Sequence, residues 1–364
     1  MAAKYKDRNA MSAAVGEVTE VAPAHLEGLS PAYFGMVMAT GIISIAAQLI
    51  DLRLIAHILF YLNCVFYITL WILTILRVIR YPRPFLNDLK DHLSGPGFFT
   101  TVAGTGVLGS QFVVLRADYY IATILWAIAA VLWITLTYTV FAGFTVKEKK
   151  PSLDKGISGG WLLAVVATQS ISVLAALLAA HVDQPGKLEM NFLALSMWLW
   201  GGMLYIWMMS LIFYRYTFFP FLPSDLSPPY WINMGAMAIS TLAGSLLILN
   251  SGDAPFLASL LPFIKGFTVF YWATGTWWIP MLLILSIWRH GHQGFPLHYD
   301  PLYWGAVFPL GMYAACTHRM IEALGFDFLL FLPEIFFYVA LIAWTLAFIG
   351  LLRYLMRHIA SFRL

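Results

Sequence analysis

Charged residues are scarce in this sequence. Asp, Glu, Lys and Arg make up 11% of its 364 residues, whereas 61% are hydrophobic, and the mean hydropathy is +0.78. Soluble domains carry about a quarter charged residues, so this composition excludes an ordinary soluble protein and predicts an all-α integral membrane protein. The formal net charge is only +3, and we therefore expect no nucleic-acid partner.

Cysteine is almost absent, because Cys64 and Cys316 are the only two and each lies in an apolar run. This excludes a disulfide framework and a cysteine-based metal site. His290 and His292 have no cysteine or carboxylate at ligand spacing, so we expect no metal there. A haem in the membrane would need paired histidines at mid-depth, whereas three other histidines lie near the ends of apolar runs: His57, His181 and His318. We therefore expect no cofactor.

The first 28 residues lack the continuous apolar segment of a signal peptide and carry Lys4, Lys6, Asp7 and Arg8. We interpret residues 1–28 as a polar cytoplasmic tail. Residues 29–358 form the predicted ten-helix transmembrane domain, and residues 359–364 form a short C-terminal tail.

Long apolar runs dominate the rest of the chain. A helix needs about 20 apolar residues to cross the hydrocarbon core. By that measure ten spans are predicted: Pro31–Leu49, Leu54–Ile79, Gly97–Leu115, Tyr119–Val146, Ser158–Ala180, Met190–Tyr214, Pro229–Leu249, Leu261–Trp288, Pro301–Thr317 and Leu329–Leu355.

Basic residues follow the even-numbered spans. Together with the N-terminal tail, these loops hold 16 of the 21 Lys and Arg residues. Positively charged loops remain on the cytoplasmic side of a membrane. The pattern predicts a multi-pass protein of the cell membrane with both termini in the cytoplasm.

A repeat of two helices runs through the sequence. Each odd-numbered span opens with a turn residue followed two positions later by an aromatic ring, as in Pro31-Ala32-Tyr33 and Pro96-Gly97-Phe98. In the first three repeats the same position beyond the ring holds threonine: Thr40, Thr105 and Thr168. The chain is therefore predicted to contain five helical hairpins.

Odd and even spans differ in composition. Eleven of the fourteen tryptophans lie in even spans, whereas odd spans are rich in small and hydroxyl residues. Bulky side chains suit lipid, and polar ones need a wet or protein-lined neighbour. We expect the odd helices to surround a central pore lined by Thr40, Gly41, Ser44, Thr105, Gly106, Thr168, Ser172, Asn233 and Ser240. The alternative is that these glycines and threonines serve helix packing alone.

The odd spans contain no Asp, Glu, Lys or Arg. Buried charges mark proton relays and tight ionic sites, so their absence predicts a neutral passage. Positive residues at its two mouths, Arg319 at the outer one, would favour the entry of anions without holding them.

Five segments carry a resemblance to a known family. "SPAYFGMVMATGIISIA", "GPGFFTTVAGTGVLGSQ", "WLLAVVATQSISV", "PPYWINMGAMAISTLAG" and "YWGAVFPLGMYA" resemble the tellurite-resistance/dicarboxylate-transporter family. Its members include bacterial tellurite-resistance protein A, the plant slow-type anion channels, and yeast malate and sulfite transporters. The resemblance covers roughly residues 29–357.

The resemblance implies a quasi-five-fold bundle of five hairpins, with a pore formed by the odd helices, and a homotrimer. It also implies a pore gate at Phe308, just before Pro309. A proline kinks a helix and can turn the preceding ring toward the axis. The alternative is a phenyl ring packed between helices.

The expected function is a passive channel, or channel-like exporter, for inorganic or small organic anions, without enzymatic activity. One alternative is a carrier for C4-dicarboxylates, sulfite or tellurite, with or without proton coupling. Another is a membrane redox enzyme, which would hold a chromophore.

Overall fold

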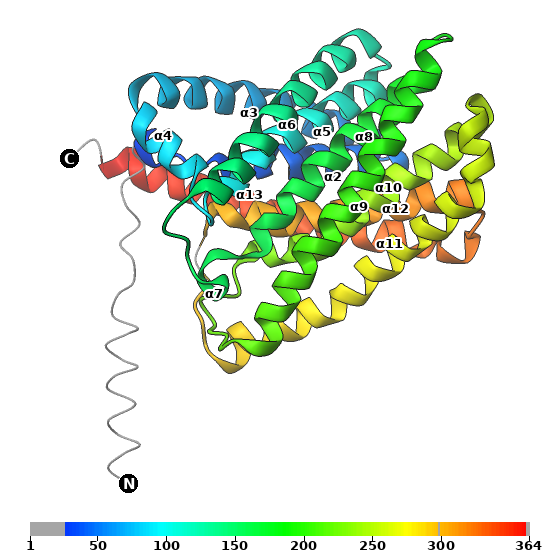
Figure 1. The fold of residues 1–364 in the computed structure, drawn as a ribbon. Helices are drawn as coiled ribbons and strands as arrows, with labels where there is room; N and C mark the ends of the chain where they lie inside the picture. Colours follow the sequence, from blue (N-terminus) through cyan, green and yellow to red (C-terminus); the bar gives the residue numbers. More distant parts are fainter. Residues whose placement is uncertain (1–25, 298, 362–364) are drawn as a thin grey trace, which may run out of the picture.

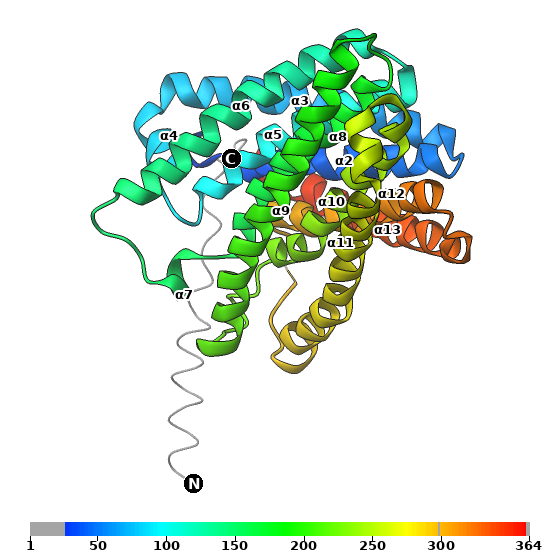
Figure 2. The ribbon, with the colours of Figure 1, turned by 45° about the vertical axis from the view of Figure 1, so that its right-hand side comes forward.

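The fold is a bundle of long helices, seen in a computed structural model that describes residues 26–297 and 299–361 (Figures 1 and 2). No strand occurs in these ranges. Five helices come from the odd-numbered spans: α2 (Gly35–Leu49), α5 (Phe99–Arg116), α8 (Leu163–Ala179), α10 (Ile232–Leu249) and α12 (Trp304–Leu324). Five come from the even-numbered spans: α3 (Arg53–Arg80), α6 (Tyr119–Val146), α9 (Gly186–Phe218), α11 (Pro255–Ile287) and α13 (Phe331–Ser361).

The predicted tails lie largely outside the described residues. Of the tail predicted at 1–28, the structure describes Leu26–Gly28, which form the short 3-10 turn η1. Of the tail predicted at 359–364, it describes the backbone to Ser361, where α13 ends.

Nine helices in the described ranges are long and apolar enough to cross a membrane. The tenth long helix, α12, falls outside this set, and its last turns carry His318, Arg319 and Glu322. These polar residues continue the helix beyond Thr317, where the apolar run predicted its end. Gly325 terminates α12 in a left-handed conformation with φ 73°, which favours glycine.

Burial separates the two sets of helices. Between 78% and 94% of the residues in the most apolar part of α2, α5, α8 and α10 are buried, against 22% to 50% in the five even-numbered helices. Most of α12 is buried as well. The odd-numbered spans are thus inner helices and the even-numbered spans outer helices. Figures 1 and 2 show α3 and α6 along one edge of the bundle and α11 along the opposite edge.

The inner helices contact one another in a closed cycle, in the order α2, α5, α8, α10, α12 and back to α2. Each outer helix packs against the inner helix of its own hairpin and also against the inner helix of the next hairpin. The outer helix α13 of the last hairpin completes this pattern by packing against α2.

All five inner helices begin with a 3-10 turn at the same end of the bundle. These turns are η2 (Pro31–Phe34), η3 (Gly95–Phe98), η4 (Gly159–Leu162), η5 (Pro228–Trp231) and η8 (Pro301–Tyr303), and they contact one another in the same cyclic order. Proline in the first turn is favourable, because its missing N–H would have no helical partner there. Ser30, Ser158 and Asp300 cap three of the turns through their side chains.

The outer helices end where the inner helices begin, and this end carries most of the basic residues. We call it the basic end. The short helices α4 (Pro82–Leu89) and α7 (Leu153–Gly156) lie in its loops, and a π-helical turn, η7 (Trp288–His292), extends α11 there.

Candidate functional site

A small cavity of about 10 Å³ lies where the five inner helices meet, and every one of them contributes to its wall. This is about the smallest space that holds one water molecule. Its lining is mostly aliphatic: Ile42, Ile45, Gly106, Val107, Ser110, Ser170, Val173, Ile239, Leu242 and Met312. The centre of the bundle is therefore closed by aliphatic side chains.

Two serines line this cavity, and the hydroxyl of each donates a hydrogen bond to a backbone carbonyl of its own helix. The Ser110 hydroxyl donates to the Gly106 carbonyl at 2.9 Å, and the Ser170 hydroxyl donates to the Ala167 carbonyl at 2.7 Å. Their protons are thus unavailable to a molecule in the cavity. An apolar constriction of this width excludes water and hydrated ions.

Phe308 is 1% exposed and lies one helical turn before Met312 on α12. Residues four apart share a helix face, so Phe308 lies on the face of α12 that lines the cavity, toward the basic end. The next residue, Pro309, packs closely on Gly235 of α10; a β-carbon at Gly235 would lie 2.7 Å from the Pro309 ring. The lack of a side chain at Gly235 is what allows this approach.

Gly106 is one of the nine predicted pore-lining residues, and it lines the cavity. The other eight are fully buried or, for Gly41, lie against buried side chains. Their side-chain polar groups are paired within the protein, as described next, except for the Asn233 amide oxygen, which is buried without a hydrogen-bond partner among the described residues. A role in lining a conducting passage stays a prediction for them.

The three aligned threonines accept hydrogen bonds from aromatic residues of outer helices. Thr40 accepts from the Trp344 indole at 2.9 Å, and Thr168 accepts from the Trp133 indole at 2.8 Å. The hydroxyl of Thr105 lies 3.0 Å from that of Tyr67. Each aromatic partner belongs to the outer helix of the preceding hairpin.

The last two hairpins repeat this link with different acceptors. The Trp198 indole of α9 donates to the Ser240 carbonyl of α10 at 2.9 Å, and the Trp272 indole of α11 donates to the Thr317 hydroxyl of α12 at 3.0 Å. Each inner helix is therefore bonded through an aromatic residue to the preceding outer helix. Their bulk alone predicts lipid contact for these rings, but their recurrence at about the hairpin spacing is a signal that points to a shared structural role.

The remaining predicted residues also bond within the protein. Ser44 and Ser172 donate to the carbonyls of Ala56 and Ala194 on the outer helices, each at 2.7 Å. The Ser240 hydroxyl donates to its own helix at Ala236, and the Asn233 amide donates to the Tyr216 hydroxyl at 3.2 Å. Gly41 makes room for a hydrogen bond between the side chains of Asn63 and Gln111.

Arg319, predicted at the outer mouth, lies near the end of α12 and forms an ion pair with Glu322 one turn later. This pairing reduces the positive potential that it supplies. Within residues 26–297 and 299–357, whose side chains the structure describes, no three His, Cys, Asp or Glu side chains are grouped as metal ligands.

At the basic end, His92 stacks on Phe144 with ring centroids 4.3 Å apart and lies beside Trp161. Burial lowers the pKa of His92 from its ordinary value, and the charges of Lys147 and Lys150 lower it further against the opposing effect of Asp91. These effects therefore favour the neutral form of the imidazole.

Comparison with known proteins identifies relatives along most of the chain. Residues 28–352 match the SLAC1 family, described as "Voltage-dependent anion channel". An uncharacterized transporter of Methanocaldococcus jannaschii is 25% identical over 83% of this chain and 88% of its own length, and a second from that organism is 24% identical over 89% and 92%. An uncharacterized membrane protein of Mycobacterium tuberculosis is 39% identical over 42% of this chain and 77% of its own length.

These matches confirm the resemblance seen in the five inner segments, and they identify a multi-pass membrane protein related to channels and transporters. The chain belongs to the SLAC1 family of voltage-dependent anion channels.

Proposed function

We propose that this protein is a passive anion channel, or channel-like exporter, whose pore runs along the axis of the five inner helices in quasi-five-fold arrangement. In this proposal ten helices cross the membrane, Phe308 is the gate, and the aliphatic wall around the cavity closes the passage beyond it.

The observation that carries the proposal is the closed cycle of inner helices around a constriction without charged residues. A carrier that holds a divalent dicarboxylate would need a basic residue in the passage, and the inner spans contain none up to Thr317. A neutral passage lets an anion through without trapping it.

The basic end is proposed to face the cytoplasm, as the positive-inside rule requires. Both termini would then be cytoplasmic and the membrane would be the cell membrane. Assembly as a homotrimer, with one pore in each protomer, is also a proposal, made from the family resemblance.

The test is chloride current across planar bilayers for the wild type, Phe308→Ala and the control Phe99→Ala. Phe99 is an equally buried phenylalanine of inner helix α5, but its ring centroid lies 6.0 Å from that of Phe141 on an outer helix. Each substitution costs about 3–5 kcal/mol of stability, so the two variants are matched in that respect.

We expect Phe308→Ala to raise the current and Phe99→Ala to leave it unchanged, because Phe308 lies one turn from the cavity-lining Met312, whereas Phe99 lies two turns from Gly106 and its ring lies beside Phe141 of α6. Each 1.4 kcal/mol removed from the permeation barrier raises the rate about ten-fold. Equal currents in all three proteins would refute the gate. Saturable, pH-dependent exchange of radiolabelled malate without current would instead establish a dicarboxylate carrier.

A further inference from the structure

Three outer helices end in a buried arginine at the basic end. Arg77, Arg215 and Arg289 are 3%, 6% and 9% exposed. Each guanidinium lies over a phenylalanine ring from the following loop, and an aspartate follows ten or eleven positions after the arginine. The rings are Phe85, Phe221 and Phe295, and the aspartates are Asp88, Asp225 and Asp300.

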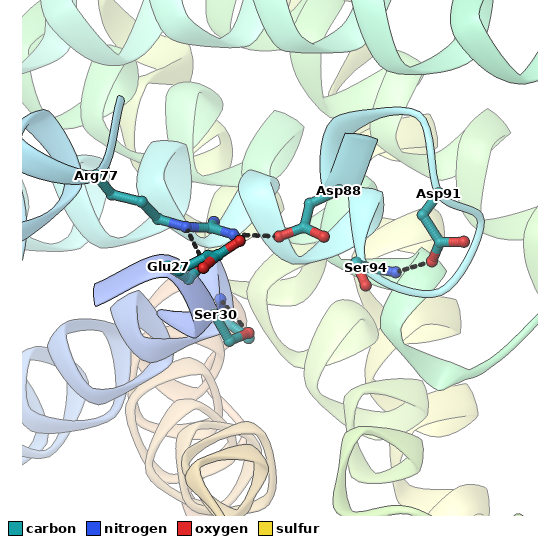
Figure 3. Close-up of polar contacts among 7 residues, drawn as sticks. Glu27, Ser30, Arg77, Asp88, Asp91 and Ser94 are labelled. Carbon is teal, nitrogen blue, oxygen red and sulfur yellow. Dashed lines mark hydrogen bonds and ion pairs between the residues drawn. The ribbon is translucent and has the colours of Figure 1, made fainter. Parts of the chain in front are cut away.

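The guanidinium of Arg77 has protein partners on two sides (Figure 3). Its Nε donates to the Glu27 carbonyl at 2.8 Å, and a terminal nitrogen pairs with the Asp88 carboxylate. Glu27 lies just before the inner helix of the same hairpin. The arginine therefore joins the two ends of its own hairpin.

Arg215 repeats this arrangement. Its Nε donates to the Asp154 carbonyl at 2.8 Å, and its terminal nitrogens contact the Tyr230 hydroxyl at 3.0 Å and the Asp225 carboxylate at 3.6 Å. Asp154 again lies just before the inner helix of the same hairpin. Two copies of the repeat thus satisfy a buried guanidinium in the same way.

The guanidinium of Arg289 lies over a phenylalanine ring, as in the other two arginines, but in the part of the chain that the structure describes it lacks the carbonyl and carboxylate acceptors that they have. Its Nε is buried without a hydrogen-bond partner, and no ion pair reaches its guanidinium from the described residues. Asp300 instead caps η8 by accepting from the Leu302 N–H at 2.8 Å. Phe295 covers one face of the guanidinium, with its ring centroid 4.2 Å from the central carbon.

The chain path explains why the carbonyl is missing. The segment before α10, which would supply it, is the loop of residues 219–227, and that loop is already folded onto Arg215 through Phe221 and Asp225. No separate segment precedes this hairpin, in contrast to η1 before α2 and α7 before α8. The kind of segment that supplies a carbonyl to Arg77 and Arg215 therefore supplies none to Arg289.

A buried, unpaired charge is costly, and a guanidinium presents N–H donors in a fork that matches two oxygens of one anion. The Phe295 ring covers one face of the Arg289 guanidinium, and the Nε–H at its edge has no hydrogen-bond acceptor within the described protein. We propose that Arg289 binds a phosphate group at the basic end of α11, supplied either by free phosphate or by a lipid headgroup.

The first experiment measures the melting temperature of the purified protein in phosphate-free detergent while inorganic phosphate replaces chloride at constant ionic strength. Arg289→Gln is compared with Arg215→Gln, which removes an equally buried guanidinium that already has protein partners. We expect phosphate to stabilise the wild type and Arg215→Gln, with affinity at least about ten-fold weaker in Arg289→Gln, since a charge-assisted hydrogen bond is lost.

Stability without phosphate provides a second readout. Arg215→Gln should lower the melting temperature because its partners lose their bonds, whereas Arg289→Gln should leave it unchanged or raise it. An equal phosphate effect in the wild type and Arg289→Gln would overturn the proposal.

Native mass spectrometry after delipidation distinguishes the two sources of the phosphate group. If free phosphate has no effect but the wild type retains one phospholipid more than Arg289→Gln, the headgroup is the ligand. If phosphate has no effect and lipid retention is equal, the site does not bind phosphate and the proposal fails.

Discussion

The Thr168 hydroxyl links inner helix α8 to outer helix α6. It donates to the Ala164 carbonyl and accepts from the Trp133 indole, so both of its capacities are used. Thr168→Val should destabilise the protein by about 1–3 kcal/mol, because the buried indole N–H loses its acceptor. Thermal unfolding measures this, with Ser110→Ala as the control, since the Ser110 hydroxyl bonds only within its own helix.

Thr168→Val also tests whether Thr168 only links two helices or contacts the permeating anion. In a Phe308→Ala background we expect Thr168→Val to leave the anion current unchanged. A fall in current at unchanged stability would instead show that Thr168 contacts the permeating anion, as the sequence pattern predicted.

We expect His92 to make the free energy of unfolding depend on pH. Its folded-state pKa lies below the ordinary value of 6.5, so the unfolded chain binds a proton at a higher pH than the folded one. Protonation therefore favours unfolding, and stability should fall as pH drops below 6.5. The difference in melting temperature between neutral and acidic pH should shrink in His92→Phe. It should persist in His292→Gln, which changes an exposed histidine of the same end.

At the scale of elements, the 3-10 turns at the basic end set the spacing of the inner helices. Gly159 of η4 lies so close to η5 that a β-carbon there would be 2.6 Å from the Pro229 carbonyl oxygen and the Tyr230 α-carbon. Backbone atoms cannot rotate away, so Gly159→Ala should cost about 1–3 kcal/mol.

Gly160→Ala is the matched control for this prediction. A β-carbon at Gly160 meets only the Ser158 hydroxyl, at 3.3 Å, and should be nearly neutral. Chemical unfolding of the two variants compares them. Equal losses would mean that the tight contact between η4 and η5 does not determine stability.

The aromatic links explain why the inner helices carry hydroxyls. In α2, α5, α8 and α12 a threonine hydroxyl is bonded to an aromatic residue of the preceding outer helix, and in α10 a backbone carbonyl takes its place. Inner helices pack through small residues, while one polar group per helix fixes its rotation against the outer layer.

For the whole molecule, composition predicted an all-α membrane protein, and the resemblance of five segments predicted the family. The long apolar helices of the described residues and the family match confirm these two predictions, while nine of the ten predicted spans are apolar enough to cross a membrane. The concentration of small residues in the odd-numbered spans and of tryptophan in the even-numbered ones also matches the difference in burial between inner and outer helices. These properties depend on composition over about 20 residues, which a single sequence contains.

The orientation of individual side chains could not be predicted in the same way. In a fully buried helix every face is apolar, so periodicity does not reveal that Ile42 and Val107 line the cavity while Thr40 faces α13. The partners are also remote in sequence, since Trp344 lies 304 positions after Thr40. The end of α12 was misplaced because its last turns are polar but helical.

The bond between Thr40 and Trp344 has a consequence for biosynthesis. The first spanning helix enters the bilayer with a hydroxyl whose aromatic partner is the last to be translated, and its contact with α12 also awaits the final hairpin. Until then one side of α2 faces lipid or a temporary neighbour. The nascent chain is therefore an open arc that becomes a ring only once the fifth hairpin has been translated, which makes that hairpin the step at which quality control can distinguish closed from open bundles.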